Sequence, residues 1–173
     1  MAADAGTVAY EFMKLKYGLV DRDIIRSARL EAHVDGIGIP YVAPDGKPCL
    51  SSNGRPYVKR RLFEPVEGRK YDNPRGAKPF IYAAPGAWDA RRVGLTEGEF
   101  DALVVTQAGL CCFATGGSSI GHDARARIIE VLCGKDGVTL VPDNDDAGQR
   151  FAEKFMGDLF GRVDLFTVEV PKQ

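Results

Sequence analysis

Hydrophobic and polar positions divide the chain into three regions with different patterns. In the first region, apolar residues recur at helical spacing at Val8, Phe12 and Leu15, and a second, shorter helical pattern follows Asp21, a residue type that often caps helices. The pattern predicts an N-terminal helical segment over residues 1–35. These helices either cover the structure that follows or dock a partner.

The second region consists of short apolar runs separated by turn residues, which is typical of antiparallel strands. Such runs occupy residues 37–42, 57–62 and 80–82. We therefore predict a small β-rich subdomain over residues 36–90. Trp88 lies near its end, where a packed hinge residue is a better interpretation than a base-stacking one.

The third region, residues 91–173, alternates apolar runs with amphipathic helical patterns. One helical pattern follows Gly98, a second begins near His122 and a third begins at Gly148. The predicted strands are residues 91–95, 110–114, 138–141 and 162–170. Strands that alternate with helices favour a parallel arrangement. The predicted fold class is therefore α/β: a four-stranded, mainly parallel sheet flanked by helices, preceded by the helical and β-rich segments.

Carboxylates follow directly after two of these predicted strands. Glu97 comes after the first strand, with Asp101 one helical turn further on. Asp143 and Asp145 come after the third strand. In an open α/β sheet, functional sites form at the carboxyl ends of the strands. We therefore expect the four carboxylates to lie close together.

Four carboxylates in one place repel one another and raise one another's pKa values unless a cation intervenes. Because no His or Cys accompanies them, the ligand set favours Mg2+ or Mn2+ over Zn2+. Such a cation indicates phosphoryl transfer on nucleotides or nucleic acid. The alternative is that Glu97 and Asp101 are ordinary acids of a strand end and a helix face. In that case, Asn144, Asp145 and Asp146 form a turn with a helix cap.

Three motifs in this region resemble one known family. They are Thr96-Glu97-Gly98-Glu99-Phe100-Asp101-Ala102-Leu103, Ala114-Thr115-Gly116-Gly117-Ser118 and Asp143-Asn144-Asp145-Asp146-Ala147-Gly148. Together they resemble the Toprim domain of topoisomerases, primases and some nucleases, most closely its bacterial and phage primase branch. The resemblance implies catalytic roles for Glu97, as a general acid or base, and for Asp101. It also implies that Asp143 and Asp145, together with Glu97, bind the metal.

A glycine-rich turn, Gly116-Gly117-Ser118, follows the second predicted strand. Glycines let the backbone approach a ligand closely, and the helix that follows can present free N–H groups to a phosphate. The turn is therefore a candidate phosphate or nucleotide site. Taken without its neighbours, the same turn indicates only a tight connection.

The β-rich region carries the densest positive charge of the chain, interleaved with aromatic residues. The candidate nucleic-acid-binding residues are Lys59, Arg60, Arg61, Arg69 and Lys70. Cations that follow phosphates and rings that stack on bases are typical of a single-stranded nucleic acid track. The alternative is a solvated strand face with its aromatics in the core, because Glu64, Glu67 and Asp72 dilute the charge.

Composition limits the remaining function classes. The 173 residues carry a net charge of −1, so contact with nucleic acid depends on a local basic patch. No apolar run approaches the roughly 18 residues of a membrane span. The first residues lack the pattern of a signal peptide, so a cytoplasmic location is expected. The four cysteines have no C-x-x-C spacing, which argues against a zinc module.

The residues and the resemblance together predict the catalytic core of a DNA primase, which makes short RNA primers on single-stranded DNA from ribonucleoside triphosphates. A replicative helicase, in the same chain or in another, is the expected partner, and no membrane is involved. The alternatives are a metal-dependent nuclease that uses the same carboxylates and a non-catalytic nucleic-acid-binding module. Related primases place a further acidic pair after the last strand. This sequence ends before such a pair, at Gln173, so we expect a longer protein to complete the metal site.

Overall fold

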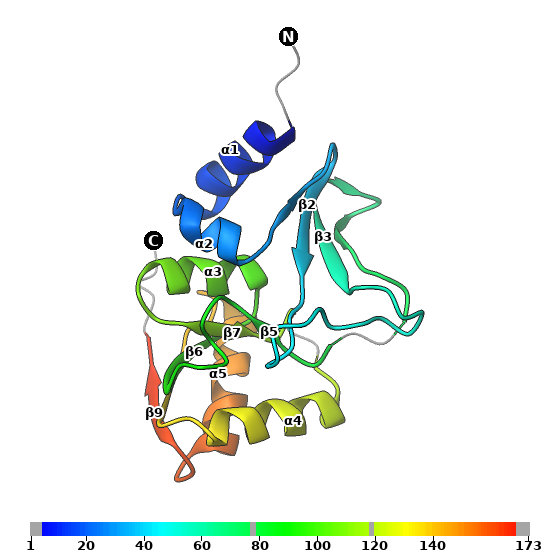
Figure 1. The fold of residues 1–173 in the computed structure, drawn as a ribbon. Helices are drawn as coiled ribbons and strands as arrows, with labels where there is room; N and C mark the ends of the chain where they lie inside the picture. The colour runs from blue at the N-terminus through cyan, green and yellow to red at the C-terminus, as the bar shows by residue number, and fades with distance from the viewer. Residues whose placement is uncertain (1–4, 77–78, 118–119, 169–173) are drawn as a thin grey trace. The chain divides into compact units, whose positions relative to one another are not determined.

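The computed structural model describes residues 5–76, 79–117 and 120–168. The chain divides into two compact units, Met1–Pro79 and Phe80–Gln173, which we call the N-terminal unit and the C-terminal unit. Figure 1 shows their helices and strands. The sequence pattern placed the last boundary after residue 90. The structure divides the chain earlier, because the strand that contains Tyr82 pairs within the C-terminal unit.

The N-terminal unit consists of helices and an antiparallel sheet. Its described elements are α1 (Ala5–Tyr17), α2 (Arg22–Ser27), β1 (Glu31–Ala32), β2 (Gly36–Pro40), β3 (Val58–Val66) and β4 (Arg69–Asp72). The strand order is β1-β2-β3-β4, and each neighbouring pair runs antiparallel. The predicted helical segment and most of the β-rich subdomain therefore fold as one unit.

The first predicted helix forms, but of the three positions that predicted it only Phe12 is packed, against Phe63. In α1, Ala9 and Met13 are buried, one helical turn apart. Val8 and Leu15 are 40% and 81% exposed. Their spacing is helical, so it identified the helix, but periodicity alone does not say which of two apolar stripes meets the rest of the unit.

The C-terminal unit has helices on both faces of a sheet. Its described elements are β5 (Tyr82–Ala83), β6 (Arg92–Thr96), α3 (Glu99–Gln107), β7 (Cys112–Ala114), α4 (His122–Cys133), β8 (Gly137–Leu140), α5 (Asp146–Leu159) and β9 (Asp164–Thr167). Over the described residues, the strand order is β5-β7-β6-β8-β9. In Figure 1, α3 lies on one face of this sheet and α4 lies on the other.

The α/β class is confirmed, but the detail of a four-stranded, mainly parallel sheet is not. Strands β7, β6, β8 and β9 run parallel to their neighbours, whereas β5 pairs antiparallel with β7 and places Tyr82 opposite Ala114. Within the described part of the chain, the sheet therefore has five strands and is mixed. The sequence assigned residues 80–82 to the β-rich subdomain, because so short a strand carries too little pattern to identify its partner.

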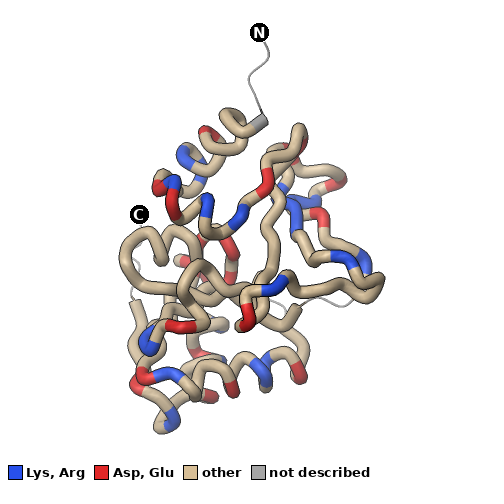
Figure 2. The backbone as a smooth tube through the Cα atoms, in the orientation of Figure 1, with Lys and Arg blue, Asp and Glu red and all other residues tan. Residues whose placement is uncertain are grey.

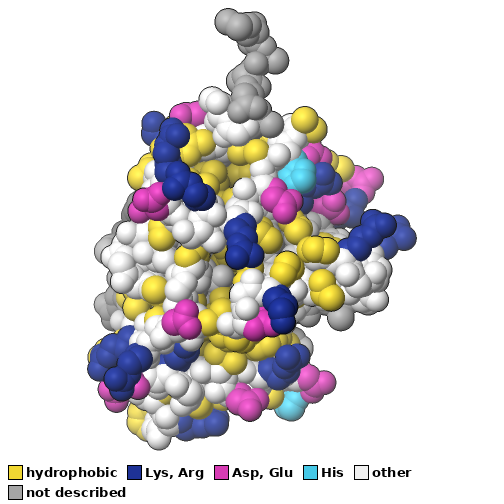
Figure 3. Space-filling view, viewed as in Figure 1, with side chains coloured by type: hydrophobic (Ala, Val, Ile, Leu, Met, Phe, Trp, Pro, Cys, Tyr) yellow, Lys and Arg dark blue, Asp and Glu magenta, His cyan; other side chains and the backbone are white. Residues whose placement is uncertain are grey.

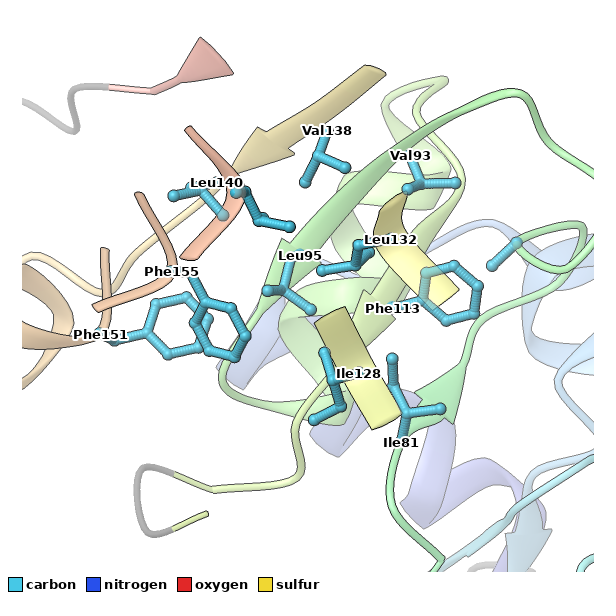
Figure 4. Close-up of a cluster of buried hydrophobic side chains, with 12 residues drawn as sticks. Ile81, Val93, Leu95, Phe113, Ile128, Leu132, Val138, Leu140, Phe151 and Phe155 are labelled. Carbon is cyan, nitrogen blue, oxygen red and sulfur yellow. The ribbon is translucent and has the colours of Figure 1, made fainter. Parts of the chain in front are cut away.

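The core of the C-terminal unit lies between the mixed sheet and the helices α4 and α5. Its buried side chains include nine that are labelled in Figure 4: Val93, Leu95, Phe113, Ile128, Leu132, Val138, Leu140, Phe151 and Phe155. Val93 and Leu95 are two positions apart on β6, so both point to the same face. Trp88 packs edge-on against Phe113, with ring centres 5.0 Å apart, which places it in a packed environment as expected.

The described helices are short. The longest of them, α5, has 14 residues, and its apolar residues form one face rather than a continuous run. None of the helices over the described ranges is long and apolar enough to cross a membrane.

A lysine just after α4 fixes the loop that follows β5. Lys135 Nζ donates to the carbonyl oxygens of Ala87, Trp88 and Ala90 at 3.1, 2.6 and 2.9 Å. Burial lowers the pKa of this lysine, although nearby Asp89 favours its charged form. The ammonium thus supplies one donor to each of three carbonyls, and we expect it to hold the loop against the sheet.

Replacing Lys135 with Met should lower the free energy of unfolding by about 1–3 kcal/mol, because the apolar stem is kept while buried carbonyls lose a donor. Urea denaturation followed by circular dichroism measures the change. Lys154→Met, at an exposed position of α5, is the matched control and should alter stability by less than about 0.5 kcal/mol. If Lys135→Met and Lys154→Met were equally stable, Lys135 would not hold the loop that follows β5.

Candidate active site

The ends of three strands meet around Glu97, the residue after β6. On one side, Val141 N–H donates to the carbonyl of Leu95 at 3.0 Å. On the other side, Thr115 N–H donates to the carbonyl of Thr96 at 3.1 Å. The segments that follow β7 and β8 therefore flank Glu97 at the carboxyl edge of the sheet, which is where sites form in open α/β folds.

Glu97 is a buried acid with an unused oxygen. Glu97 is only 6% exposed, and its Oε1 atom has no hydrogen-bond partner among the described residues. Burial raises the pKa of Glu97 above its ordinary value, and the charges of Asp143, Asp145 and Asp101 raise it further. These neighbours are the other three carboxylates that the sequence predicted to converge.

Asp101 lies in the first turn of α3 and is fixed against the backbone that precedes it. Gly98, the N-cap residue of α3, has no side chain, and a Cβ there would overlap the Oδ2 atom of Asp101. The pKa of Asp101 is raised by burial and then by the charge of Asp143. The glycine between the two predicted catalytic acids therefore leaves room for the second carboxylate.

Asp143 and Asp145 occupy the turn between β8 and α5. Asp145 is the N-cap of α5, and its Oδ1 accepts from Gly148 N–H at 2.8 Å. Gly148 lies so close to the turn that a Cβ would overlap the backbone of Asp143. Burial raises the pKa of Asp143, and the charge of Asp145 adds to the effect. One oxygen of Asp145 is thus used in capping, which was the alternative interpretation of this motif.

The glycine-rich turn lies beside Glu97. Gly116 and Gly117 have φ angles of 71° and 139°, a region that residues with a side chain rarely adopt. Gly117 N–H donates to the carbonyl of Glu97 at 3.0 Å. Ser118, the third residue of the predicted phosphate site, lies outside the described residues. The structure therefore brings the glycine turn to the backbone of Glu97 and leaves Ser118 untested.

The donor set fits a hard divalent cation. Burial and neighbouring carboxylates raise the pKa values of Glu97, Asp101 and Asp143, and the unpaired Oε1 of Glu97 is a free acceptor among them. Over the residues that the structure describes, no three His, Cys, Asp or Glu side chains are close enough to hold a metal ion by themselves. Mg2+ sites often use one or two carboxylates and complete the shell with water and substrate oxygens, so Asp143, Asp145 and Glu97 remain suitable ligands.

The sequence pattern did not identify one buried acid near the site. Glu99, in the first turn of α3, is 1% exposed. Its charge, together with the larger effect of burial, raises the pKa of the Tyr82 hydroxyl. Glutamate is usually exposed, so only its position between Glu97 and Asp101 could have marked it.

The predicted nucleic-acid-binding residues do not form one exposed track. Lys59 and Arg61 are 5% and 3% exposed. Lys59 and Arg61 are two positions apart on β3 and pair with Ile39 and Ile37 of β2, respectively. Residues that lie opposite each other on neighbouring strands share a face of the sheet. The buried face therefore includes both cations, and the prediction that they follow a phosphate backbone in solvent is not supported.

Aromatic and polar groups surround the two buried cations. The Arg61 guanidinium donates to the Tyr17 hydroxyl at 2.9 Å and to the Lys70 carbonyl at 3.2 Å, and it lies 5.4 Å from the centre of the Tyr71 ring. Lys59 Nζ lies 4.0 Å from the centre of the same ring. The interleaved aromatics thus bind these cations within the N-terminal unit, as cation–π contacts do elsewhere.

The other three basic residues are more accessible. Arg60 is partly exposed and donates to Asp72 at 2.7 Å, while the exposed Arg69 donates to Glu67 at 2.8 Å. Lys70 is exposed. Basic and acidic positions are interspersed along the backbone in Figure 2 and over the face in view in Figure 3. Of the five candidates, Arg69 and Lys70 are those best placed to contact a polyanion.

Comparison with known families agrees with the motifs. Residues 94–173 match the family model Toprim_2, described as Toprim-like. Residues 94–173 are therefore Toprim-like, as the resemblance predicted. A comparison with curated proteins found no match.

Among solved structures, the chain is similar to a DNA primase domain from Pseudomonas aeruginosa, with a TM-score of 0.58 and 15% sequence identity. The likeness covers 92% of this chain, so it extends beyond the segment that matches the family model. The chain spans 55% of that primase domain. At this identity, the likeness is one of fold.

We expect the protein to bind Mg2+ or Mn2+ through Asp143 and Asp145. The variant Asp143→Asn with Asp145→Asn should lower the affinity by at least about tenfold, because each amide lacks the charge that offsets the cation. Asparagine at 145 can still cap α5, so folding is preserved. Isothermal titration calorimetry measures binding, and Asp123→Asn, at an exposed position of α4, is the control.

Protons compete with the metal for the same carboxylates. Because the pKa values of Glu97, Asp101 and Asp143 are raised, metal affinity should begin to fall at a higher pH than ordinary carboxyl pKa values would give. Titrations at several pH values test this. If the wild type and the variant Asp143→Asn with Asp145→Asn bound metal equally, the predicted metal site would be wrong.

Proposed function

We propose that the chain contains the catalytic core of a DNA primase, a metal-dependent nucleotidyltransferase that joins ribonucleotides on a single-stranded DNA template. The observation that carries the proposal is the buried, unpaired Oε1 of Glu97 among Asp101, Asp143 and Asp145, beside a glycine turn in a Toprim-like domain. The likeness in fold to a primase domain supports the same choice. Ribonucleoside triphosphates are the proposed substrates, and a replicative helicase is the proposed partner.

In this proposal, Asp143, Asp145 and Glu97 hold Mg2+ or Mn2+. When bound, the cation supplies positive charge to the reacting phosphate and favours ionisation of the primer 3′-hydroxyl. The Oε1 of Glu97 has no partner among the described residues, so it is the proposed proton acceptor. Glu97 would therefore take the proton of the attacking hydroxyl, with Asp101 fixed one turn away.

The glycine turn supplies the complementary contact to the nucleotide. At Gly116 and Gly117 the backbone has no side chain between it and a ligand, so it can approach the triphosphate closely. Phosphate held there would lie next to the carboxylates, because Gly117 N–H is bonded to the Glu97 carbonyl. The turn would thus position the substrate, and the acids would act on it.

The substitution Glu97→Gln should lower primer synthesis by about 10²–10⁴-fold, because the amide has nearly the same shape but cannot accept the proton. The assay is incorporation of labelled ribonucleotides on single-stranded DNA with Mg2+ or Mn2+. Glu130→Gln, at an exposed position of α4, should keep full activity. Circular dichroism and template binding should be the same for both variants.

The same experiment separates the alternatives. A cleavage assay on the labelled oligonucleotide is run beside the synthesis assay. Metal-dependent cleavage without synthesis would identify a Toprim nuclease, in which Glu97 activates water. Template binding with neither activity would identify a non-catalytic module and would contradict the proposed chemistry.

Arg69 and Lys70 are the proposed contacts to the template backbone. Replacing both with Gln should weaken binding to single-stranded DNA and reduce the salt dependence by about 0.7 for each phosphate that the protein no longer neutralises. Fluorescence anisotropy with a labelled oligonucleotide at several salt concentrations measures both. Lys14→Gln with Arg26→Gln, at exposed helical positions of the same unit, removes equal charge and serves as the control. An equal effect in the two double variants would point to net charge rather than to these residues.

A further inference from the structure

Two buried threonine hydroxyls connect the turn that carries Glu97 to β7 and to the glycine turn that follows β7. Thr96 is the last residue of β6, and Thr115 follows the last residue of β7. Both residues are buried. The Thr96 hydroxyl bonds to the turn that carries Glu97 and to β7, and the Thr115 hydroxyl bonds within the glycine turn and lies near the Glu97 carbonyl.

Thr96 fixes the turn that follows its own strand. Its hydroxyl donates to the carbonyl of Gly98 at 3.0 Å and is shared with the carbonyl of Phe113 on β7 at 3.3 Å. The Gly98 carbonyl also accepts the first helical bond of α3, from Ala102 N–H at 3.1 Å. One hydroxyl therefore connects the strand, the neighbouring strand and the start of the helix that presents Asp101.

Thr115 makes the matching connection from the other side. Its hydroxyl donates to the carbonyl of Gly117 at 2.9 Å and lies 3.4 Å from the carbonyl of Glu97. Gly117 N–H in turn donates to the same Glu97 carbonyl at 3.0 Å. The backbone of Glu97 is thus held by the glycine turn, and the glycine turn is held by Thr115.

These hydroxyl bonds are additional to what the sheet requires. The Thr115 N–H to Thr96 carbonyl bond already continues the β6–β7 pairing past the strand ends. A Val at either position would fill nearly the same space without a hydroxyl, and at Thr96, within β6, it would suit a buried parallel strand better. The hydroxyls therefore add a constraint on the turns rather than packing.

We propose that Thr96 and Thr115 are positioning residues that make the Glu97 turn and the glycine turn move as one unit. The proposal rests on the proposed function for its consequence: a triphosphate held at Gly116 and Gly117 is then fixed relative to the Glu97 carboxylate. Misplacement of reacting groups by about 1 Å costs on the order of a hundredfold in rate, so a link of this kind acts on turnover.

The test compares Val and Ser substitutions at Thr96 and at Thr115 in the synthesis assay. Each Val variant should lower kcat by about tenfold to a hundredfold while KM stays within about twofold, and each Ser variant should restore most of the rate. Thr106→Val is the matched control: Thr106 Oγ1 donates to Ala102 within α3 at 2.8 Å, away from the turns. It should lose stability similarly and keep kcat. Val variants with wild-type kcat would overturn the proposal.

Amide hydrogen exchange gives a readout that does not need activity. Exchange at Gly117 N–H, followed by NMR, should be at least about tenfold faster in Thr115→Val than in the wild type and unchanged in Thr106→Val. Equal exchange in Thr115→Val and the wild type would overturn the link between the turns. A wild-type protein without synthesis would overturn the proposed function instead, and the exchange rates would then decide the link alone.

Discussion

Repulsion among carboxylates at the end of β6 is the constraint on which the candidate site depends. Glu97 lies buried near Asp101, Asp143 and Asp145, and both burial and neighbouring charge raise its pKa. Such a cluster becomes favourable only when a proton or a cation offsets the charge. The repulsion that makes these acids unfavourable together is therefore also the physical basis of the hard-cation binding that we propose.

Glycines hold the acids in this arrangement. Gly98 has no side chain where the carboxylate of Asp101 lies, and Gly148 has none where the backbone of Asp143 passes. A larger residue at either position would displace an acid or the backbone that carries it. The glycines that follow the strands in the sequence motifs thus serve the geometry of the carboxylates, in addition to the turns themselves.

The sequence predicted those features whose cause is local. A strand followed by a carboxylate, a glycine and a helix occupies a few consecutive residues, so Glu97 and Asp143 could be identified. The same holds for the Asp21 cap, whose side chain accepts from the N–H groups of Asp23 and Ile24. The burial of Arg61 depends instead on the register of β3 against β2 and on Tyr17, 44 residues earlier. No local pattern contains such partners, and the same is true of the pairing of β5 with β7.

Buried charge alone does not mark a functional residue, and the two units illustrate the difference. In the N-terminal unit, Arg61 has a hydroxyl, carbonyls and aromatic rings around it, so its donors are used and its role is structural. In the C-terminal unit, Glu97 is almost as buried, but its Oε1 has no partner over the described residues. A buried ion whose partners are complete stabilises the fold, whereas one that lacks a partner and lies among like charges requires an external ion, proton or substrate. The completeness of the partners, which the sequence could not supply, favours a structural role for Lys59 and Arg61 and supports our proposal that the acidic cluster acts in chemistry.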